Sequence, residues 1–236
     1  MNFFSLRIII IFLAGCSVTQ HLFCQAPQPY DWKNQQKYKG VEIKTTYVSM
    51  YDSVRLAVDV YLPENRKSNE KFPVIVHQTR YWRSPQLRWP FSMFSNGLLG
   101  KTGDLVTAFV EHGYVVVNVD VRGSGASFGS RTHPWSGSEI QDGYEILEWI
   151  ARQEWSSGFV GSTGFSYSGT TAEFLAGTGH PSLKAVMLNY CLYDVYDDIS
   201  FPGGIHHKYF TDNWGKANAA LDKDIYPQRV SLPICW

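Results

Sequence analysis

Cysteine is scarce in this chain, and the charges balance. The 236 residues include four cysteines, and removal of an N-terminal leader would take at least one of them, so a disulfide framework is not expected. The sequence has no Cys-x-x-Cys pair and no His-Glu-x-x-His helix, so it does not support a metal site. His206 and His207 are adjacent, which is more typical of a loop or helix than of metal ligation. Lysine plus arginine and aspartate plus glutamate number 21 each. This balance gives no general attraction to nucleic acid or to an acidic membrane surface.

A run long enough to span a membrane is also missing at the N-terminus. The apolar run Ile8–Ala14 follows Arg7 and falls far short of the roughly 20 residues that a spanning helix needs, which is typical of an export leader. It ends in Leu13-Ala14-Gly15-Cys16, which resembles the bacterial lipobox and predicts a periplasmic or outer-membrane lipoprotein anchored through acylated Cys16. Cleavage at Cys24-Gln25-Ala26 is the alternative, and it would release a soluble periplasmic or secreted protein.

What the sequence does contain is short β-branched runs that alternate with helical patterns. Strands are predicted at 41–48, 54–62, 73–79, 114–121, 159–165 and 183–190, and helices at 104–112, 139–153 and 167–176. The turn Tyr51-Asp52-Ser53 joins the first two strands into a hairpin. The alternation predicts an α/β fold with a mostly parallel sheet, in which active-site residues gather at the carboxyl ends of the strands.

The chain also divides into segments that differ in composition and hydrophobic pattern. These are a leader at 1–26, a linker at 27–40, an α/β core at 41–192, the start of a helical cap at 193–230 and the start of a further core strand at 231–236. The cap segment is rich in aromatic and acidic residues and has only a weak helical pattern. Aromatic residues make up 15% of the whole chain, which suits a protein with a lined cleft.

One motif has the sequence and the context of a catalytic nucleophile. Gly164-Phe165-Ser166-Tyr167-Ser168-Gly169 lies between a strand pattern and a helix pattern, as a nucleophile elbow requires. Small neighbours, here Gly164 and Ser168, let the backbones pass closely while the Ser166 hydroxyl stands above the sheet. The amide N–H after the serine then faces the developing oxyanion. The second glycine comes one residue later than in the strict Gly-x-Ser-x-Gly pattern, so a turn without chemistry is the alternative interpretation.

A second glycine-rich loop does not fit a dinucleotide site. Gly123-Ser124-Gly125 follows a predicted strand, but Phe128 stands where a third glycine is wanted, and the next helix begins only near Ser138. We therefore interpret the loop as a tight turn in which Arg122 pairs with a nearby acid such as Asp142.

Several longer stretches together resemble one enzyme family. They are YDSVRLAVDVYLP from Tyr51, VRGSGASFG from Val121, DGYEILEWIARQEWSSGFVGSTGFSYSG from Asp142 and GTTAEFLA from Gly169. In this order they resemble the serine hydrolases that include cocaine esterase, glutaryl acylase and X-Pro dipeptidyl-peptidase, across about 41–190. The resemblance implies an α/β-hydrolase fold, Ser166 as the nucleophile, no cofactor, and a small-molecule ester, amide or short peptide as substrate. It says nothing of oligomeric state.

The resemblance also implies an oxyanion hole. Its donors would be the hydroxyl of Tyr81 and the backbone N–H of Tyr167. The family has an Arg-Thr-Pro-Tyr-like stretch before this tyrosine, whereas this chain has Gln78-Thr79-Arg80-Tyr81 followed by Trp82. An ordinary cleft aromatic is the alternative role for Tyr81. A tyrosine hydroxyl is chemically suited to the oxyanion role, because a phenol stays protonated at neutral pH and can donate a hydrogen bond to an alkoxide.

The partners that Ser166 needs are not evident in the sequence. In this fold class an acid and then a histidine follow the serine along the chain. The resemblance puts the acid after the strand that begins at 231–236 and the histidine later still, before a C-terminal jelly-roll domain, so we expect this chain to be truncated. A compact triad of Asp197 or Asp198 with His206 is a weaker alternative. The rival function is a catalytically silent exported lipoprotein or binding domain on a hydrolase scaffold.

The acidic residues of the cap segment have two interpretations. Some members of the family use carboxylates here to bind the free amino group of a substrate, and Asp194, Asp197 or Asp198 would be the candidates. The other interpretation is a solvated acidic helix or loop.

Overall fold

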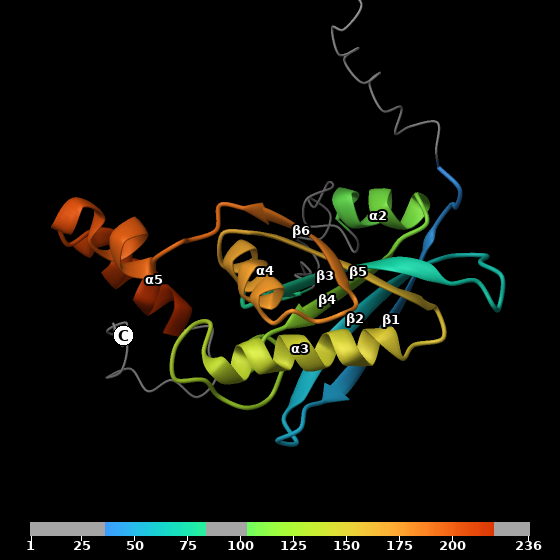
Figure 1. Cartoon of the computed structure of the whole chain (residues 1–236), viewed down its shortest axis with the longest axis horizontal. Helices are drawn as coiled ribbons and strands as arrows, with labels where there is room; N and C mark the ends of the chain where they lie inside the picture. The colour runs from blue at the N-terminus through green and yellow to red at the C-terminus, as the bar shows by residue number, and fades with distance from the viewer. Residues whose placement is uncertain (1–35, 84–102, 220–236) are drawn as a thin grey trace, which may run out of the picture. The chain divides into compact units, whose positions relative to one another are not determined.

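The computed structural model describes residues 36–83 and 103–219 (Figure 1). The strands are β1 (Val41–Ser49), β2 (Arg55–Pro63), β3 (Phe72–Thr79), β4 (Val115–Asp120), β5 (Ser156–Phe165) and β6 (Leu183–Asn189). The helices are α2 (Asp104–Glu111), α3 (Gly137–Ala151), α4 (Tyr167–Gly177) and α5 (Lys208–Ala219), with short π and 3₁₀ turns η4 (Tyr196–Ser200) and η5 (Pro202–Gly204).

The six strands form one sheet in the order β1-β2-β4-β3-β5-β6. The hairpin β1–β2 is antiparallel, and β2 also pairs antiparallel with β4. All later pairs are parallel: β4 with β3, β3 with β5, and β5 with β6. Because parallel strands carry their carboxyl ends to one edge, the residues after β3, β4, β5 and β6 meet at that edge.

Alternation along the strands gives the sheet two buried faces. Val74, Val76, Val117 and further aliphatic residues pack with α3 and α4 in the larger core. The intervening residue Val116 belongs to a smaller core, which it forms with Tyr61 and Val110 of α2. In Figure 1, α3 and α4 accordingly lie next to each other and α2 lies apart from them. Continuous β-branched runs are what such doubly covered parallel strands require.

The predicted secondary structure and fold class are confirmed. Within the described residues, every predicted strand and helix is present, with ends that differ by three residues at most; the largest difference is the start of β5, at Ser156 instead of Phe159. A mostly parallel sheet follows the predicted opening hairpin. The predicted leader at 1–26, most of the linker at 27–40 and the strand at 231–236 lie outside the described residues, so export and the lipid anchor on Cys16 stay predictions.

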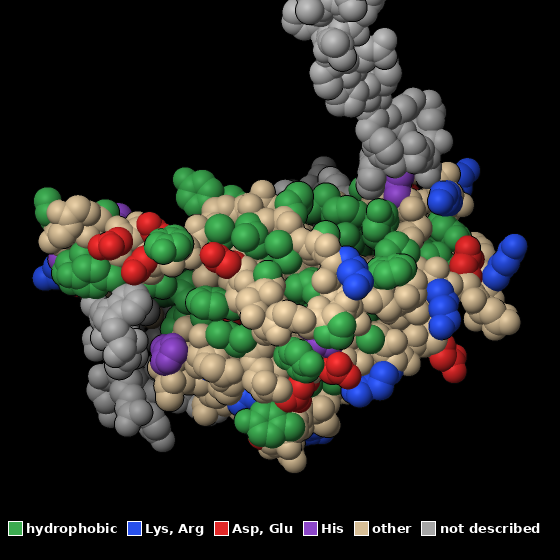
Figure 2. Space-filling view, in the orientation of Figure 1, with side chains coloured by type: hydrophobic (Ala, Val, Ile, Leu, Met, Phe, Trp, Pro, Cys, Tyr) green, Lys and Arg blue, Asp and Glu red, His purple; other side chains and the backbone are tan. Residues whose placement is uncertain are grey.

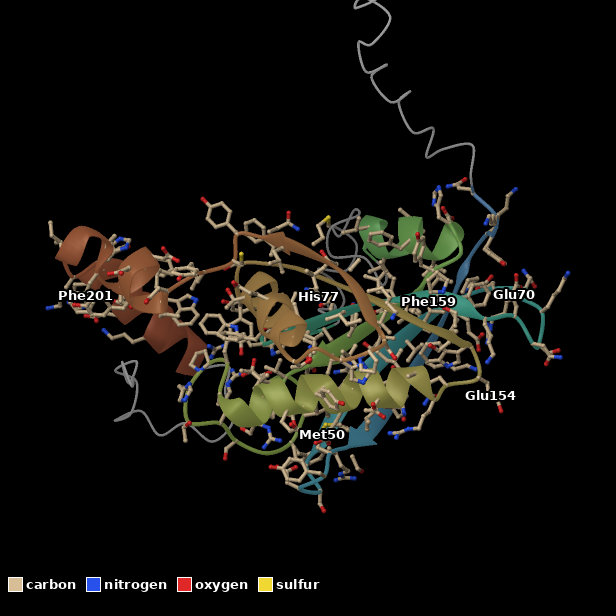
Figure 3. All side chains as sticks on the ribbon, in the orientation of Figure 1. Met50, Glu70, His77, Glu154, Phe159 and Phe201 are labelled. Carbon is tan, nitrogen blue, oxygen red and sulfur yellow. The ribbon has the colours of Figure 1, made fainter. Side chains whose placement is uncertain are left out.

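The segment predicted as a cap is helical in its described part. It contains η4, η5 and α5. Within it, the Phe201 ring stacks on the Tyr196 ring at 4.5 Å and on the His206 ring at 4.8 Å. In Figure 3, Phe201 lies at the far end of this segment from the sheet. Within 36–83 and 103–219, no helix combines the length and apolar character that crossing a membrane would need.

The sheet contains a histidine that makes folding stability depend on pH. Burial lowers the pKa of His77, on β3, to about 4 (Figure 3). An unfolded chain binds this proton near pH 6.5, so stability present above that pH is lost as the pH falls toward 4. We expect the unfolding free energy to drop by about 2 kcal/mol between about pH 7.5 and about pH 5 from this group. Urea unfolding at both pH values checks this, and His77→Gln should remove that part of the pH dependence.

Candidate active site

Ser166 occupies a strained turn between a strand and a helix. It follows the last residue of β5 and precedes the first residue of α4, and its backbone has φ 57° and ψ −120°. Residues with a side chain rarely adopt a positive φ, and ψ here is also far from the left-handed helical region. The turn is held at both ends, because Ser166 N–H donates to Asn189 O and Thr170 N–H donates to Ser166 O, each at 3.0 Å. The side chain of Ser166 is exposed.

The two glycines of the motif are required by close backbone approach. A Cβ at Gly164 would lie 2.3 Å from the carbonyl carbon and oxygen of Ser168. A Cβ at Gly169 would lie 2.5 Å from the carbonyl oxygen of Asn189, at the end of β6. The later position of the second glycine therefore has a physical reason: here α4 packs its third residue, and not its second, against the neighbouring strand. The expectation that small residues let these backbones pass agrees with this geometry.

Tyr167 has a buried side chain and a backbone N–H at the start of α4. Its hydroxyl donates to Glu139 and accepts from Arg131 at 2.9 Å, and the side chain is 2% exposed. Burial, then the charge of Glu139, raises the pKa of this phenol well above its usual range. The ring is therefore a neutral internal support. The N–H of Tyr167, in contrast, belongs to the first turn of a helix, where amides have no partner within the helix.

Tyr81 lies on the loop after β3 and is 39% exposed. Its backbone N–H donates to the Thr79 hydroxyl at 3.0 Å, and its ring meets the Tyr167 ring edge-on at 5.9 Å. Its hydroxyl accepts a hydrogen bond from the Trp214 indole at 3.1 Å. The structure thus brings the side chains of Tyr81, on the loop after β3, and Tyr167, at the start of α4, into contact with each other.

Arg83 anchors the loop that carries Tyr81. Its backbone N–H donates to Asp120 at 2.6 Å, and its guanidinium pairs with Asp120 at 2.7 Å and with Asp59 at 3.1 Å. Both carboxylates are buried. Removing one member of such a buried ion pair would leave an uncompensated charge, so these contacts hold the loop firmly to the middle of β2, through Asp59, and to the end of β4, through Asp120.

A cavity of about 610 Å³ opens beside the turn. Its lining comes from the core, from the β4–α3 loop and from the predicted cap segment, and it is mainly aromatic and aliphatic. The lining residues are His133, Pro134, Trp135, Phe165, Ser166, Tyr167, Phe174, Tyr190, Leu192, Val195, Tyr196, Asp198, Ile199, Ser200, His207, Phe210, Thr211 and Trp214. Figure 2 shows hydrophobic and several acidic side chains gathered over α5 and the segment before it. The volume lies in the range of sites for small organic molecules.

Backbone strain concentrates at this cavity. Three lining residues with side chains have positive φ: Trp135 at 55°, Ser166 at 57° and Tyr190 at 56°. Trp82, beside Tyr81, has a φ of 70°. Each such residue costs on the order of 1–3 kcal/mol and persists only where surrounding contacts enforce it, most often at functional sites.

The cap carboxylates and histidines serve mainly local contacts. Asp198 accepts the backbone N–H groups of Tyr193 and Asp194 at 2.7 and 2.9 Å, although it also lines the cavity. His206 bonds the Thr211 hydroxyl at 3.1 Å. In the described part of the chain, the Ser166 hydroxyl has no hydrogen-bond partner. The geometry accordingly gives no support to a compact triad of Asp197 or Asp198 with His206.

The loop Gly123–Gly125 is the tight turn that its sequence predicts. Arg122 donates to both carboxylate oxygens of Asp142 at 2.6 and 2.5 Å, as expected, and also to Asp52 at 2.9 Å, which the sequence did not indicate. These bonds raise the pKa of the Arg122 guanidinium above its usual range. The pairing fastens the opening hairpin and α3 to the end of β4.

Sequence reasoning missed the supports behind the turn. Trp135 stacks on the Tyr167 ring at 4.7 Å and donates its indole N–H to the Tyr167 carbonyl at 3.2 Å. Glu139 accepts from the Trp135 backbone N–H at 3.2 Å and from Arg131 at 3.1 Å. These residues come from the loop and helix after β4, and no local pattern distinguishes Trp135 or Arg131. Ser136 with Glu139 does match a helix-capping signature, which could have drawn attention to Glu139.

A mostly parallel sheet with an antiparallel hairpin, helices on both faces and a serine on a strained strand-to-helix turn define the α/β-hydrolase class. The model of the X-Pro dipeptidyl-peptidase (S15) family matches residues 52–230. The chain belongs to this family of hydrolases, as its resemblance predicted.

Named relatives agree with this membership. The chain is 49% identical over 195 residues to the "Putative serine esterase" of Mycobacterium bovis, covering 80% of this chain and 31% of that protein. It is 35% identical over 149 residues to a cocaine esterase of Rhodococcus, covering 63% and 23%. A crystal structure of a CocE/NonD family hydrolase from Staphylococcus aureus matches with a TM-score of 0.67 and 31% identity, over 78% of this chain and 34% of that one. The chain thus spans about a third or less of the lengths of these relatives.

Proposed function

We propose that this chain carries the nucleophile and the oxyanion donors of a serine hydrolase. The enzyme would cleave an ester or amide bond in its substrate, which carries either an acyl group or an X-Pro-type dipeptidyl group. One observation carries the proposal: Ser166 is exposed on a strained turn at the start of α4 and lines a cavity of about 610 Å³. A turn without chemistry has no need to hold a serine at positive φ next to an open cavity.

In the proposed reaction, the Ser166 oxygen attacks the substrate carbonyl carbon and its proton passes to a histidine base. The negative charge that develops on the carbonyl oxygen is held by the Tyr167 N–H and the Tyr81 hydroxyl. Collapse of this intermediate expels the alcohol or amine, which takes the proton, and leaves an acyl group on Ser166. Water then attacks the acyl-enzyme by the same steps, releasing the acid and restoring the hydroxyl.

The cavity supports a substrate with a sizeable apolar group. Aromatic rings from the core and from the cap segment, such as Trp135, Tyr196 and Phe210, make up much of its lining. Among the described residues that line the cavity, Asp198 is the one with a carboxylate. Its Oδ2 already accepts two backbone N–H groups. One oxygen of this carboxylate thus has a local structural role in the cap segment. The names of the relatives, esterase and dipeptidyl-peptidase, are compatible with either bond type.

The test is covalent labelling. We expect a fluorophosphonate probe to modify the full-length protein at a single serine, and peptide mass spectrometry to locate the adduct on the peptide that contains Ser166. The probe reacts only with a hydroxyl that a base has activated, because a serine alkoxide does not form unaided at neutral pH. Labelling at another serine, or none, would count against the proposal.

A silent binding domain on the same scaffold is the second candidate. The observation that favours it is that the Ser166 hydroxyl has no hydrogen-bond partner within residues 36–83 and 103–219, because a serine without a base is not activated. The same experiment separates the two, since a serine without a base would stay unlabelled while the folded protein still bound apolar esters in its cavity.

A further inference from the structure

We propose that Trp214, on α5, is a positioning residue that sets the direction of the Tyr81 hydroxyl, so that its proton faces the oxyanion. The inference rests on the proposed function and adds a role for a residue of the cap segment. It starts from one contact, the hydrogen bond between two side chains that are 133 residues apart in the sequence.

The direction of this hydrogen bond is fixed by chemistry. An indole N–H can only donate, whereas a phenol oxygen both donates and accepts. At the 3.1 Å contact, Tyr81 must therefore be the acceptor from Trp214. In the described part of the chain, the Tyr81 hydroxyl donates to no protein group, so its own proton remains available. Because the Trp214 N–H occupies one lone pair of the Tyr81 oxygen, the Tyr81 O–H bond points away from the indole.

Trp214 is held in place by packing rather than by this bond alone. Its ring lies parallel to that of Trp135 at 6.4 Å, and the guanidinium of Arg80 lies over its face at 5.4 Å. Arg80 is 1% exposed and also lies over the Tyr167 ring, at 5.3 Å. Aromatic and cation–π contacts of this kind restrain ring orientation. The indole N–H is consequently aimed before any substrate arrives.

The same set of rings supports both proposed oxyanion donors. Trp135 stacks on Tyr167 and bonds its carbonyl, while Trp214 stacks on Trp135 and bonds Tyr81. An oxyanion hole works because its donors are oriented before charge develops. Part of that orientation thus comes from α5, which also lines the cavity, so the hole is complete only when this helix is packed against the core.

The experiment removes the donor while it keeps the shape. In the full-length protein, Trp214 is replaced by 3-benzothienylalanine, in which sulfur replaces the N–H, and separately by phenylalanine. With a p-nitrophenyl ester we expect kcat to fall about 10-fold while KM stays nearly constant, because misdirected groups cost rate in the transition state. In a Tyr81→Phe background the same changes at position 214 should cost nothing more. Trp155→Phe makes a matched change away from the cavity and should leave kcat unchanged.

The outcomes separate this inference from the proposed function. Equal losses with and without the Tyr81 hydroxyl, a change in KM alone, or full kcat in the benzothienyl variant would overturn the role of Trp214. If Ser166→Ala abolishes turnover in those same assays, the hydrolase proposal survives that failure. If Ser166→Ala keeps its activity, both proposals fall.

Discussion

Replacing Ser166 with alanine is expected to lower kcat for a p-nitrophenyl ester by roughly 10⁵-fold or more, to the background rate. The reason is that no acyl-enzyme can form without the serine oxygen, and the oxyanion donors alone give only a small residual acceleration. Initial rates of nitrophenolate release by the full-length protein, wild type and variant at equal concentration, measure the loss.

Folding should be untouched by this substitution. Alanine and serine both carry a Cβ, so the backbone cost of φ 57° at this position is the same for the two residues. The Ser166 hydroxyl also makes no hydrogen bond within the described residues that the variant would lose. Thermal melting should therefore coincide for the two proteins. Ser157→Ala, at the opposite end of β5, is the matched control, and a Ser166→Ala protein that still turns over would end the assignment.

The sheet was predictable because each strand had a local signature. Runs such as Val115–Val117 cannot sit in a half-exposed strand, and their burial between α2 and α3 follows from that composition. The Arg122–Asp142 pair was predictable as well, since a charged residue at the end of a buried strand needs a partner. Element ends were less certain. β5 begins at Ser156, where polar residues hide the strand pattern.

The supports of the candidate site could not be predicted in this way. Trp135 lies in a loop and Trp214 in a segment with only a weak helical pattern, and their stacking exists only once α5 has packed against the core. Tyr81 was predicted as an oxyanion donor only through a family resemblance. The hydrogen bond to its hydroxyl comes from Trp214, which is 133 residues away in the sequence. Periodicity reports which face of an element is buried, whereas this site depends on how three separate segments meet.

Replacing Tyr81 with phenylalanine is the second large effect that we expect: a fall in kcat of about 10²- to 10³-fold with little change in KM, as for loss of one oxyanion donor. The phenylalanine ring can keep the edge-on contact with Tyr167 at 5.9 Å, and the loop stays anchored by Arg83, so only the hydroxyl is removed. A donor that acts on the transition state affects kcat, because the ground-state carbonyl carries little charge.

Tyr209→Phe is the matched control for Tyr81→Phe, since it removes a hydroxyl from an 82% exposed ring on α5. Steady-state kinetics of the three full-length proteins on one ester separate the possibilities. If Tyr81→Phe raises KM and spares kcat, the ring is an ordinary part of the substrate cleft. If it lowers kcat as expected, the hydroxyl acts where charge develops. A proton that the Trp214 contact already directs toward the oxyanion would strengthen this donor, because a freely rotating hydroxyl spends part of its donor strength on reorientation.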